Sequence, residues 1–204
     1  MNSRLILDNL SPKKALQKLI DGNKRFMQHE HTKRDFMQEV IDVIETQYPF
    51  AIILGCIDSR VPVEILFDQG VGDLFVTRIA GNFENEDSIA SMEYACKIVG
   101  SKIIMVLGHQ DCGAIKAACD EVNIGYIPKL TARIKPAIQQ TKTLGNYSSN
   151  NKEYVDAIAK TNIRLTMGRI REKSRVLRKL EEENKILIVG AFYELNTGKI
   201  IIID

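Results

Sequence analysis

The sequence lacks the features that mark membrane and secreted proteins. No apolar run in its 204 residues approaches the roughly 18 residues of a membrane span. The opening residues, MNSRLILDNLSPKKALQ, lack the basic start and the continuous apolar run of a signal peptide. The net charge of +2 gives no sign of a nucleic-acid or membrane surface. We therefore expect a cytoplasmic protein with neither nucleic acid nor membrane as a partner.

Cysteine and histidine are also scarce. Four cysteines are too few for a disulfide scaffold in a chain of this size, and in a reducing compartment they are more often free, metal-bound or catalytic. Two of the three histidines, His29 and His31, lie in the polar stretch QHEHTK, where we expect surface side chains. The third, His109, lies three residues before Cys112, so this pair could hold a metal, activate a thiol or fill a core.

What is present predicts one globular domain. With 45% hydrophobic and 26% charged residues, the chain can bury one sizeable core. We expect a single domain over 1–204, with an N-terminal helical arm over 1–45 and an α/β core over 46–204. In the arm, Ser11 and Pro12 resemble a helix N-cap and first helical residue, and a second helix is expected over 36–44. The first arm helix has no clear place on a sheet, so we expect it to lie over a partner subunit.

The core has the pattern of an α/β fold. Short apolar runs cover 50–55, 73–78, 102–108 and 185–193, and helical patterns lie between them, most clearly at 88–99 and 112–121. This alternation predicts a mostly parallel four-stranded sheet with flanking helices. The closing NTGKIIIID adds a turn and a C-terminal antiparallel edge strand.

The segment 127–180 has no strand pattern and predicts two or three helices. Its basic residues between 160 and 179 alternate with apolar ones. An RNA-binding face is one interpretation of these charges, but we favour the solvated flank of an amphipathic helix.

Three residues with metal-binding side chains follow predicted parallel strands. Cys56 comes directly after the first strand, His109 follows the third, and Cys112 begins the next helix. Because ligands gather at the carboxyl ends of parallel strands, we expect these side chains to meet. Two thiolates and one imidazole form a zinc set that leaves the fourth position open for water or substrate. Cys96 and Cys119 lie in predicted helices, where we expect small buried apolar residues.

The stretch CIDSR adds a charged pair to this set. Asp58 and Arg60 follow Cys56 at alternate positions, so all three side chains can share one side of an extended loop. A guanidinium next to a carboxylate keeps it ionised and fixes it by two hydrogen bonds.

CIDSRVP together with GHQDCGAIKAA resembles the β-class carbonic anhydrases, whose signature is Cys-x-Asp-x-Arg followed by His-x-x-Cys. The similarity extends through ALQKLIDGNKRF, FVTRIAGN and SMEYA to GAFYELNTGKI. It implies that Cys56, His109 and Cys112 bind Zn²⁺ and that Asp58 and Arg60 form the catalytic dyad. It also implies an obligate dimer, often paired into tetramers, with the active site at the subunit interface.

The resemblance assigns further pocket residues. Gln47 matches a glutamine that hydrogen-bonds substrate, and Gly113 matches a glycine whose backbone amide faces the ligand. Phe75 and Tyr94 match aromatic residues that wall the pocket from the partner subunit. By their types alone, both aromatic residues would be assigned to the core.

Two departures from the family pattern concern hydrogen bonding and regulation. In RIAGN, Ile79 replaces an asparagine that many members have. Arg78 and Tyr193 match two residues of a bicarbonate pocket found in one subgroup, but Ile53 stands where that pocket has a tryptophan, and the chain contains no tryptophan. We therefore expect that bicarbonate inhibition is not inherited unchanged.

The implied function is reversible hydration of carbon dioxide to bicarbonate and a proton, through zinc-bound hydroxide. Asp58 would accept the remaining hydrogen of the hydroxide, and direct binding of Asp58 to zinc would close the site in a resting state. One alternative is a carbon disulfide or carbonyl sulfide hydrolase on the same zinc site, and another is a non-catalytic zinc-stabilised interaction protein. A cysteine hydrolase is a weaker alternative, because His109 and Cys112 lack a separate orienting residue.

Overall fold

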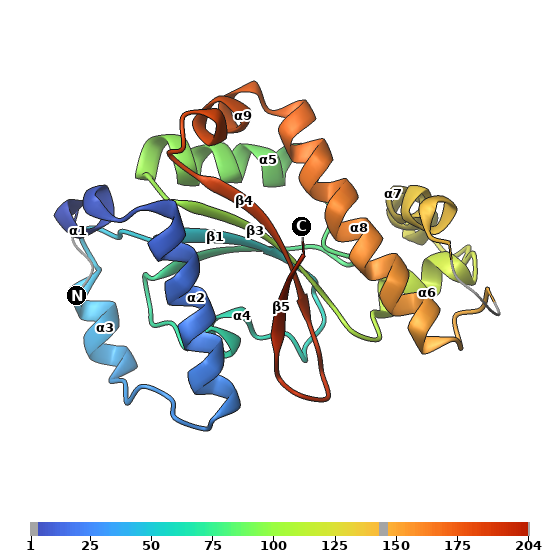
Figure 1. Cartoon of the computed structure of the whole chain (residues 1–204), viewed down its shortest axis with the longest axis horizontal. Coiled ribbons are helices and arrows are strands. Elements are labelled where there is room, and N and C mark those ends of the chain that lie inside the picture. The colour runs from blue at the N-terminus through green and yellow to red at the C-terminus, as the bar shows by residue number, and fades with distance from the viewer. Residues whose placement is uncertain (1–3, 143–146, 204) are drawn as a thin grey trace.

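One sheet organises the chain, and the computed structural model describes residues 4–142 and 147–203. Within these residues the strand order is β2-β1-β3-β4-β5, with β5 antiparallel to β4 and the other neighbours parallel (Figure 1). This confirms the predicted mostly parallel sheet with a C-terminal antiparallel edge strand. The strands are β1 (Ala51–Gly55), β2 (Leu74–Arg78), β3 (Ile103–His109), β4 (Leu187–Tyr193) and β5 (Ile200–Ile203).

The central strands β1 and β3 are buried on both faces, as their uninterrupted apolar runs predict. Successive side chains of a strand point to opposite faces of the sheet. Along β1, Ile52 and Leu54 therefore join one hydrophobic cluster, whereas Ile53 joins a second one. Each face needs its own layer of helices.

Helices supply both layers. Two of them, α1 and α4, are not foreseen by the sequence pattern, because helices of six residues or fewer are too short to show a period. No helix among the described residues is long and apolar enough to span a bilayer. The helices are α1 (Arg4–Asn9), α2 (Pro12–Met27), α3 (Phe36–Asp42), α4 (Val63–Leu66), α5 (Glu86–Glu93), α6 (Gly113–Cys119), α7 (Ile127–Gln140), α8 (Lys152–Lys173) and α9 (Arg175–Glu182), with a π-helical stretch, η1 (Tyr94–Val99), directly after α5.

The first layer, which includes α5, α8 and α9, packs on one face of the sheet (Figure 1). Its longest helix, α8, approaches the sheet closely at two glycines. A Cβ atom added at Gly108 of β3 or at Gly190 of β4 would lie 2.8 Å or 2.5 Å from the side chain of Ile163. Glycine at these positions lets Ile163 reach the backbone of both strands. This contact holds α8 against the carboxyl end of β3.

The second layer is formed mainly by α2, which begins as the sequence predicts. The Ser11 side chain caps the helix by accepting a hydrogen bond from the Lys14 N–H, and Pro12 is its first residue. Ala15 and Leu19 are fully buried in the same cluster as Ile53. The helix therefore does have a place on its own sheet, because α2 covers an apolar face of it, and a contact between α2 and a partner subunit stays a prediction.

The next arm helix, α3, packs differently. It buries none of its residues, and the exposed fractions of Phe36, Met37 and Ile41 are 60%, 69% and 56%. The helix expected over 36–44 ends at Asp42. An apolar helix surface of this kind is a candidate interface.

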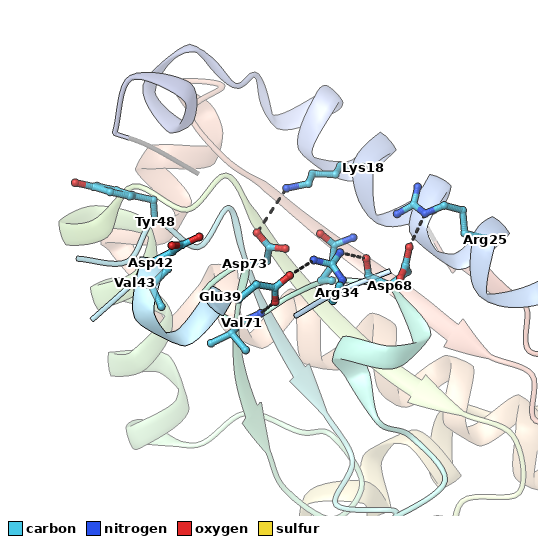
Figure 2. A pocket seen from close by; sticks show the side chains of 12 residues that line it. Lys18, Arg25, Arg34, Glu39, Asp42, Val43, Tyr48, Asp68, Val71 and Asp73 are labelled. Atoms are coloured by element: carbon cyan, nitrogen blue, oxygen red, sulfur yellow. Dashed lines mark hydrogen bonds and ion pairs between the residues drawn. The ribbon is translucent and has the colours of Figure 1, made fainter. Parts of the chain in front are cut away.

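Polar contacts attach α3 to the turn before β2. The Arg34 guanidinium donates to the Glu39 carboxylate at 2.9 Å, and Glu39 accepts a second hydrogen bond from the Val71 N–H at 2.9 Å. Arg34 also donates to the main-chain oxygen of Asp68. Figure 2 shows these residues around a cavity of about 250 Å³ between α2, α3 and this turn.

Asp68 is the centre of this polar network. Its side chain is 4% exposed and accepts hydrogen bonds from Arg25 of α2 and from the hydroxyl and N–H of Thr32. Because a buried carboxylate is stable only when it is paired, Asp68 ties the segment between α2 and α3 to the core.

Candidate active site

The carboxyl ends of the neighbouring strands β1 and β3 lie side by side at the point where the strand order of the sheet reverses. β1 pairs with β2 on one side and with β3 on the other, which is the kind of switch point where α/β sheets bind ligands. Cys56 follows β1, His109 ends β3, and Cys112 directly precedes α6. The structure brings these predicted ligand residues together, with their ligand atoms all within 4.8 Å of one another. The sulfur atoms of Cys56 and Cys112 are 4.0 Å apart.

His109 is completely buried and presents one nitrogen to this cluster. Its Nδ1 lies 2.9 Å from the Gln110 main-chain oxygen, which can only accept, so Nδ1 carries the proton and the neutral ring has its lone pair on Nε2. Nε2 is buried and has no hydrogen-bond partner among the described residues. An unpaired buried acceptor costs about 1–3 kcal/mol. A cation bound at Nε2 would remove that cost, so the histidine fits a metal ligand.

The two thiols also fit a cation. Hydrogen bonds from the Cys112 thiol, and further ones that include the Gly81 N–H at 3.4 Å, lower the pKa of Cys56 to about 4. The same hydrogen bond to Cys56, together with burial and the charge of its thiolate, raises the pKa of Cys112. A divalent cation compensates two thiolate charges, and two sulfurs with one imidazole are typical of a zinc site that has an open fourth position. Together, these residues could hold a metal ion.

Asp58 and Arg60 form a two-pronged ion pair beside the cluster. Arg60 donates from Nε to Oδ1 of Asp58 at 2.9 Å and from Nη2 to Oδ2 at 2.8 Å, and its N–H also donates to Oδ1. These hydrogen bonds lower the pKa of Asp58 to about 2 and raise the pKa of Arg60. Oδ2 of Asp58 lies 3.8 Å from Nε2 of His109. An ionised carboxylate therefore adjoins the candidate metal ligands, and Arg60 fixes its orientation.

The candidate ligand group found among the described residues consists of Cys56, His109 and Cys112 and does not include Asp58. Arg60 engages both carboxylate oxygens of Asp58, so the carboxylate is held by the guanidinium. This arrangement leaves three protein ligands, as in an open catalytic site.

Arg78 and Tyr193, the two predicted bicarbonate-pocket residues, lie apart. Arg78 ends β2 and donates from Nε to the main-chain oxygen of Cys56 at 2.8 Å and from Nη2 to the main-chain oxygen of Asp58 at 2.6 Å. Tyr193 lies on β4 and lines a cavity of about 400 Å³ whose described lining does not include Arg78. Ile53, which replaces the subgroup's tryptophan, is completely buried. In this structure Arg78 supports the loop that carries Cys56 and Asp58.

Phe75 and Tyr94 are not brought to the cluster of their own chain. Their ring centroids are 6.4 Å apart, and they line a cavity of about 480 Å³ along β2, an edge strand of the sheet. Gln47 is exposed and precedes β1, so the length of β1 separates it from Cys56. Gly113 does adjoin the cluster as the first residue of α6, and a Cβ atom there would meet nothing within 4 Å.

Sequence reasoning missed a second layer of the site, which comes from α8. Asp156 accepts a hydrogen bond from the Asp111 N–H at 2.9 Å, in the turn between His109 and Cys112. Asn162 is completely buried and donates to the Gly81 oxygen at 2.8 Å. The signal for both was weak, because a lone polar residue in a helix is normally interpreted as solvent-facing.

The remaining cysteines and histidines lie outside the cluster. Cys96 is buried, and burial raises its pKa to about 12, so it is an inert core thiol. Cys119 is half-buried against the core. His29 is exposed, and the half-exposed His31 side chain lies 3.9 Å from Asp68.

Known proteins resemble this chain in sequence and in fold. The carbonic anhydrase family profile matches residues 51–200. Carbonic anhydrase 2 of Mycobacterium tuberculosis is 32% identical over 207 residues, which span 97% of this chain and 96% of that protein. The carbonic anhydrase of Mycolicibacterium smegmatis is 33% identical over 201 residues, which span 95% and 94% of the two proteins.

Solved structures show the same architecture. The β-carbonic anhydrase CafA of Aspergillus fumigatus superimposes with a TM-score of 0.73 at 22% identity, covering 94% of this chain and 90% of that one. One of two tetrameric β-carbonic anhydrases of Sordaria macrospora gives 0.71 at 23% identity, covering 89% and 90%. The family profile and the mycobacterial relatives extend this likeness from fold to family, and the chain belongs to the carbonic anhydrases, in the β class.

Proposed function

We propose that this protein catalyses the reversible hydration of carbon dioxide to bicarbonate and a proton, with Zn²⁺ held by Cys56, His109 and Cys112. The observation that carries the proposal is the position of the Asp58 carboxylate, 3.8 Å from the unpaired Nε2 of His109 and fixed by Arg60. When bound, zinc supplies Lewis acidity that makes a water molecule acidic near neutral pH. The mycobacterial relatives, which are named as carbonic anhydrases, support the same reaction.

Asp58 has a specific role in this proposal. With zinc bound, its ionised carboxylate would accept a hydrogen bond from the oxygen nucleophile and so would orient a lone pair of that oxygen toward the carbon of carbon dioxide. Arg60 keeps Asp58 ionised and holds it back from the ligand cluster, because both carboxylate oxygens are occupied by the guanidinium and the Arg60 N–H. Asp58 and Arg60 thus form the dyad on which turnover depends.

Gly113 supplies space for the substrate next to Cys112. A side chain at this position would project into a region that contains no other atoms within 4 Å. The open space and the backbone N–H at the start of α6 suit a small molecule that becomes an anion during the reaction.

We propose that two copies of the chain combine their surfaces around each site. The cavity formed by Phe75 and Tyr94 opens along the edge strand β2, and Tyr94 is 56% exposed. The apolar surface of α3 is uncovered as well. In a symmetric dimer, Phe75, Tyr94 and Gln47 of one copy would wall the site of the other. Tetramers are named for the Sordaria proteins, and the dimer is the smaller unit that the site requires.

The proposal extends to the whole chain. We infer a single domain over 1–204, with residues 1–45 as an arm whose helix α2 packs on the domain itself. We also infer a cytoplasmic location, because all four cysteines are free thiols and reduced thiolates bind zinc.

A rate comparison tests the reaction. Carbon dioxide hydration by the zinc-loaded protein, followed by stopped-flow with a pH indicator, should exceed the buffer rate by several orders of magnitude. The same preparation is offered carbon disulfide and carbonyl sulfide, and sulfide release is measured. Faster release of sulfide than hydration would replace the proposal by a sulfide-releasing hydrolase, and the absence of all three activities would indicate a non-catalytic zinc protein.

A further inference from the structure

We propose that Asp156 of α8 is a positioning residue of this site, which holds Arg60 in place through the turn at Asp111. The inference rests on the proposed function, because it assigns a role in aiming the Asp58–Arg60 dyad. Asp156 itself does not contact the candidate metal ligands directly. It acts through two hydrogen-bonded steps.

The first step is the contact between Asp156 and the Asp111 backbone. Oδ1 of Asp156 accepts the Asp111 N–H at 2.9 Å. Asp111 has φ +56, in the left-handed region that non-glycine residues seldom adopt. A residue in this region persists only where its surroundings hold it there. The acceptor on α8 is one such restraint on the turn that separates His109 from Cys112.

The second step is the contact between Asp111 and Arg60. Nη2 of Arg60 donates to the Asp111 main-chain oxygen at 3.3 Å, and Nη1 lies 3.7 Å from the Asp111 carboxylate. The same Nη2 also donates to Asp58. The guanidinium is therefore held between Asp58 on one side and the Asp111 turn on the other. A rotation of the Asp111 peptide would remove one of these two supports.

Two lysines of this region, Lys116 and Lys160, have contacts of their own. Lys116 of α6 forms an ion pair with the Asp111 carboxylate. This ion pair compensates the charge of the Asp111 side chain, but it does not orient the Asp111 backbone N–H. Lys160, one helical turn beyond Asp156, lies over the Phe192 ring at 4.7 Å. Asp156 is half-buried. Burying a carboxylate costs free energy unless a hydrogen-bond donor satisfies it. The donor to Asp156 is the Asp111 N–H, which belongs to the turn that supports Arg60.

The position of α8 makes this contact possible. Ile163 lies against Gly108, the residue before His109, so α8 passes directly behind the carboxyl end of β3. Asp156 lies on the same helix, toward its N-terminal end. The helix packing that builds the core thereby carries an acceptor to the turn after β3.

The test compares Asp156→Ala with Asp156→Asn, whose amide oxygen still accepts a hydrogen bond. Glu153→Ala is the matched control, because Glu153 is exposed on the same helix. At equal zinc content, kcat/KM for carbon dioxide should fall about tenfold in Asp156→Ala and stay within about twofold of wild type in Asp156→Asn and in the control. Asp156→Leu, which refills the space without an acceptor, serves as a second variant if the alanine protein does not fold.

A second readout does not depend on activity. The rate at which phenylglyoxal modifies Arg60, followed by peptide mapping, should rise severalfold in Asp156→Ala or Asp156→Leu and remain unchanged in Asp156→Asn. Unchanged labelling of Arg60 would overturn the proposal even if the rate fell. An equal loss in Asp156→Asn would also overturn it and would assign a proton-carrying role instead, and loss of zinc would assign a role in metal retention. Failure of the proposed function itself is distinguishable, since the wild type would then show no hydration while the labelling experiment still reports on Arg60.

Discussion

The guanidinium of Arg60 meets the carboxylate of Asp58 edge to edge, with parallel N–H donors at 2.9 and 2.8 Å. This pairing lowers the pKa of Asp58 to about 2, so the carboxylate is ionised at any pH near neutrality. Arg60 thereby fixes the negative charge of Asp58 beside the cluster of Cys56, His109 and Cys112. Three hydrogen bonds from Arg60 thus fix the orientation of the Asp58 carboxylate within the loop.

Replacing Asp58 by asparagine removes the charge and half of the accepting capacity while nearly preserving the shape. We expect Asp58→Asn to lower kcat/KM for carbon dioxide hydration by about 10²–10³ with one zinc per chain retained. Asp87→Asn, on the exposed surface of α5, is the control and should match wild type. Intact turnover in zinc-loaded Asp58→Asn would show that Asp58 has no part in the reaction.

Arg60→Lys keeps the positive charge but loses the pair of parallel N–H donors that the guanidinium presents to Asp58. A single ammonium cannot donate two parallel hydrogen bonds to one carboxylate, so Asp58 gains freedom to rotate. Stopped-flow hydration should be about tenfold slower. The same exchange at the exposed Arg133 should have no effect, and equal rates for Arg60→Lys and Arg133→Lys would rule out the geometric role.

Co-expression tests whether each site uses aromatic residues of the other copy. Asp58→Asn and Tyr94→Ala should each be impaired alone. In a mixed dimer, however, one of the two sites has an intact Asp58 from one copy and an intact Tyr94 from the other. Random pairing should therefore restore about a quarter of the wild-type rate. A mixture no more active than the mean of its two parents would mean that each site is complete within one chain.

Asp68 should make the stability of the arm dependent on pH. Burial alone would raise the pKa of Asp68, but the hydrogen bonds from Arg25 and Thr32 outweigh it, and the pKa is lowered overall. A group whose pKa is lowered on folding contributes stability above its ordinary value of about 4, and this contribution is lost as the pH falls below that value. We expect Asp68→Asn to lower the free energy of unfolding at pH 7 by about 2 kcal/mol, measured by urea denaturation.

The pH series supplies the check on this assignment. The difference between wild type and Asp68→Asn should shrink as the pH is lowered from 7 to 3. Asp42→Asn, at the rim of the same cavity, is the control and should give little change. A difference that stays constant with pH would show that the ionised form of Asp68 is not what stabilises the arm.

The sequence predicts the parts of the fold that depend on continuous local patterns. The apolar runs of β1 and β3 indicate buried parallel strands, and this topology alone brings Cys56 and His109 to one edge although 53 positions separate their numbers. The position of α2 is a different matter. Its amphipathic pattern shows that one side is covered, but it does not show whether the covering surface belongs to the same chain.

The second layer of the site could not be predicted for a related reason. Asp156 and Asn162 are single polar residues within a long helix, and their function depends on where α8 crosses the sheet. That crossing is set by the packing of Ile163 on Gly108 and Gly190, a contact between segments far apart in the chain. Local periodicity contains no information about such a contact.

Zinc content per chain tests the central claim most directly. Wild type and Cys119→Ala, purified in parallel and analysed by atomic emission, should each contain one zinc per chain, because Cys119 lies outside the cluster. Cys112→Ala should lose most of the metal after dialysis against a mild chelator, since only two protein ligands remain. Full zinc in Cys112→Ala, or no zinc in wild type after zinc-supplemented growth, would contradict the account.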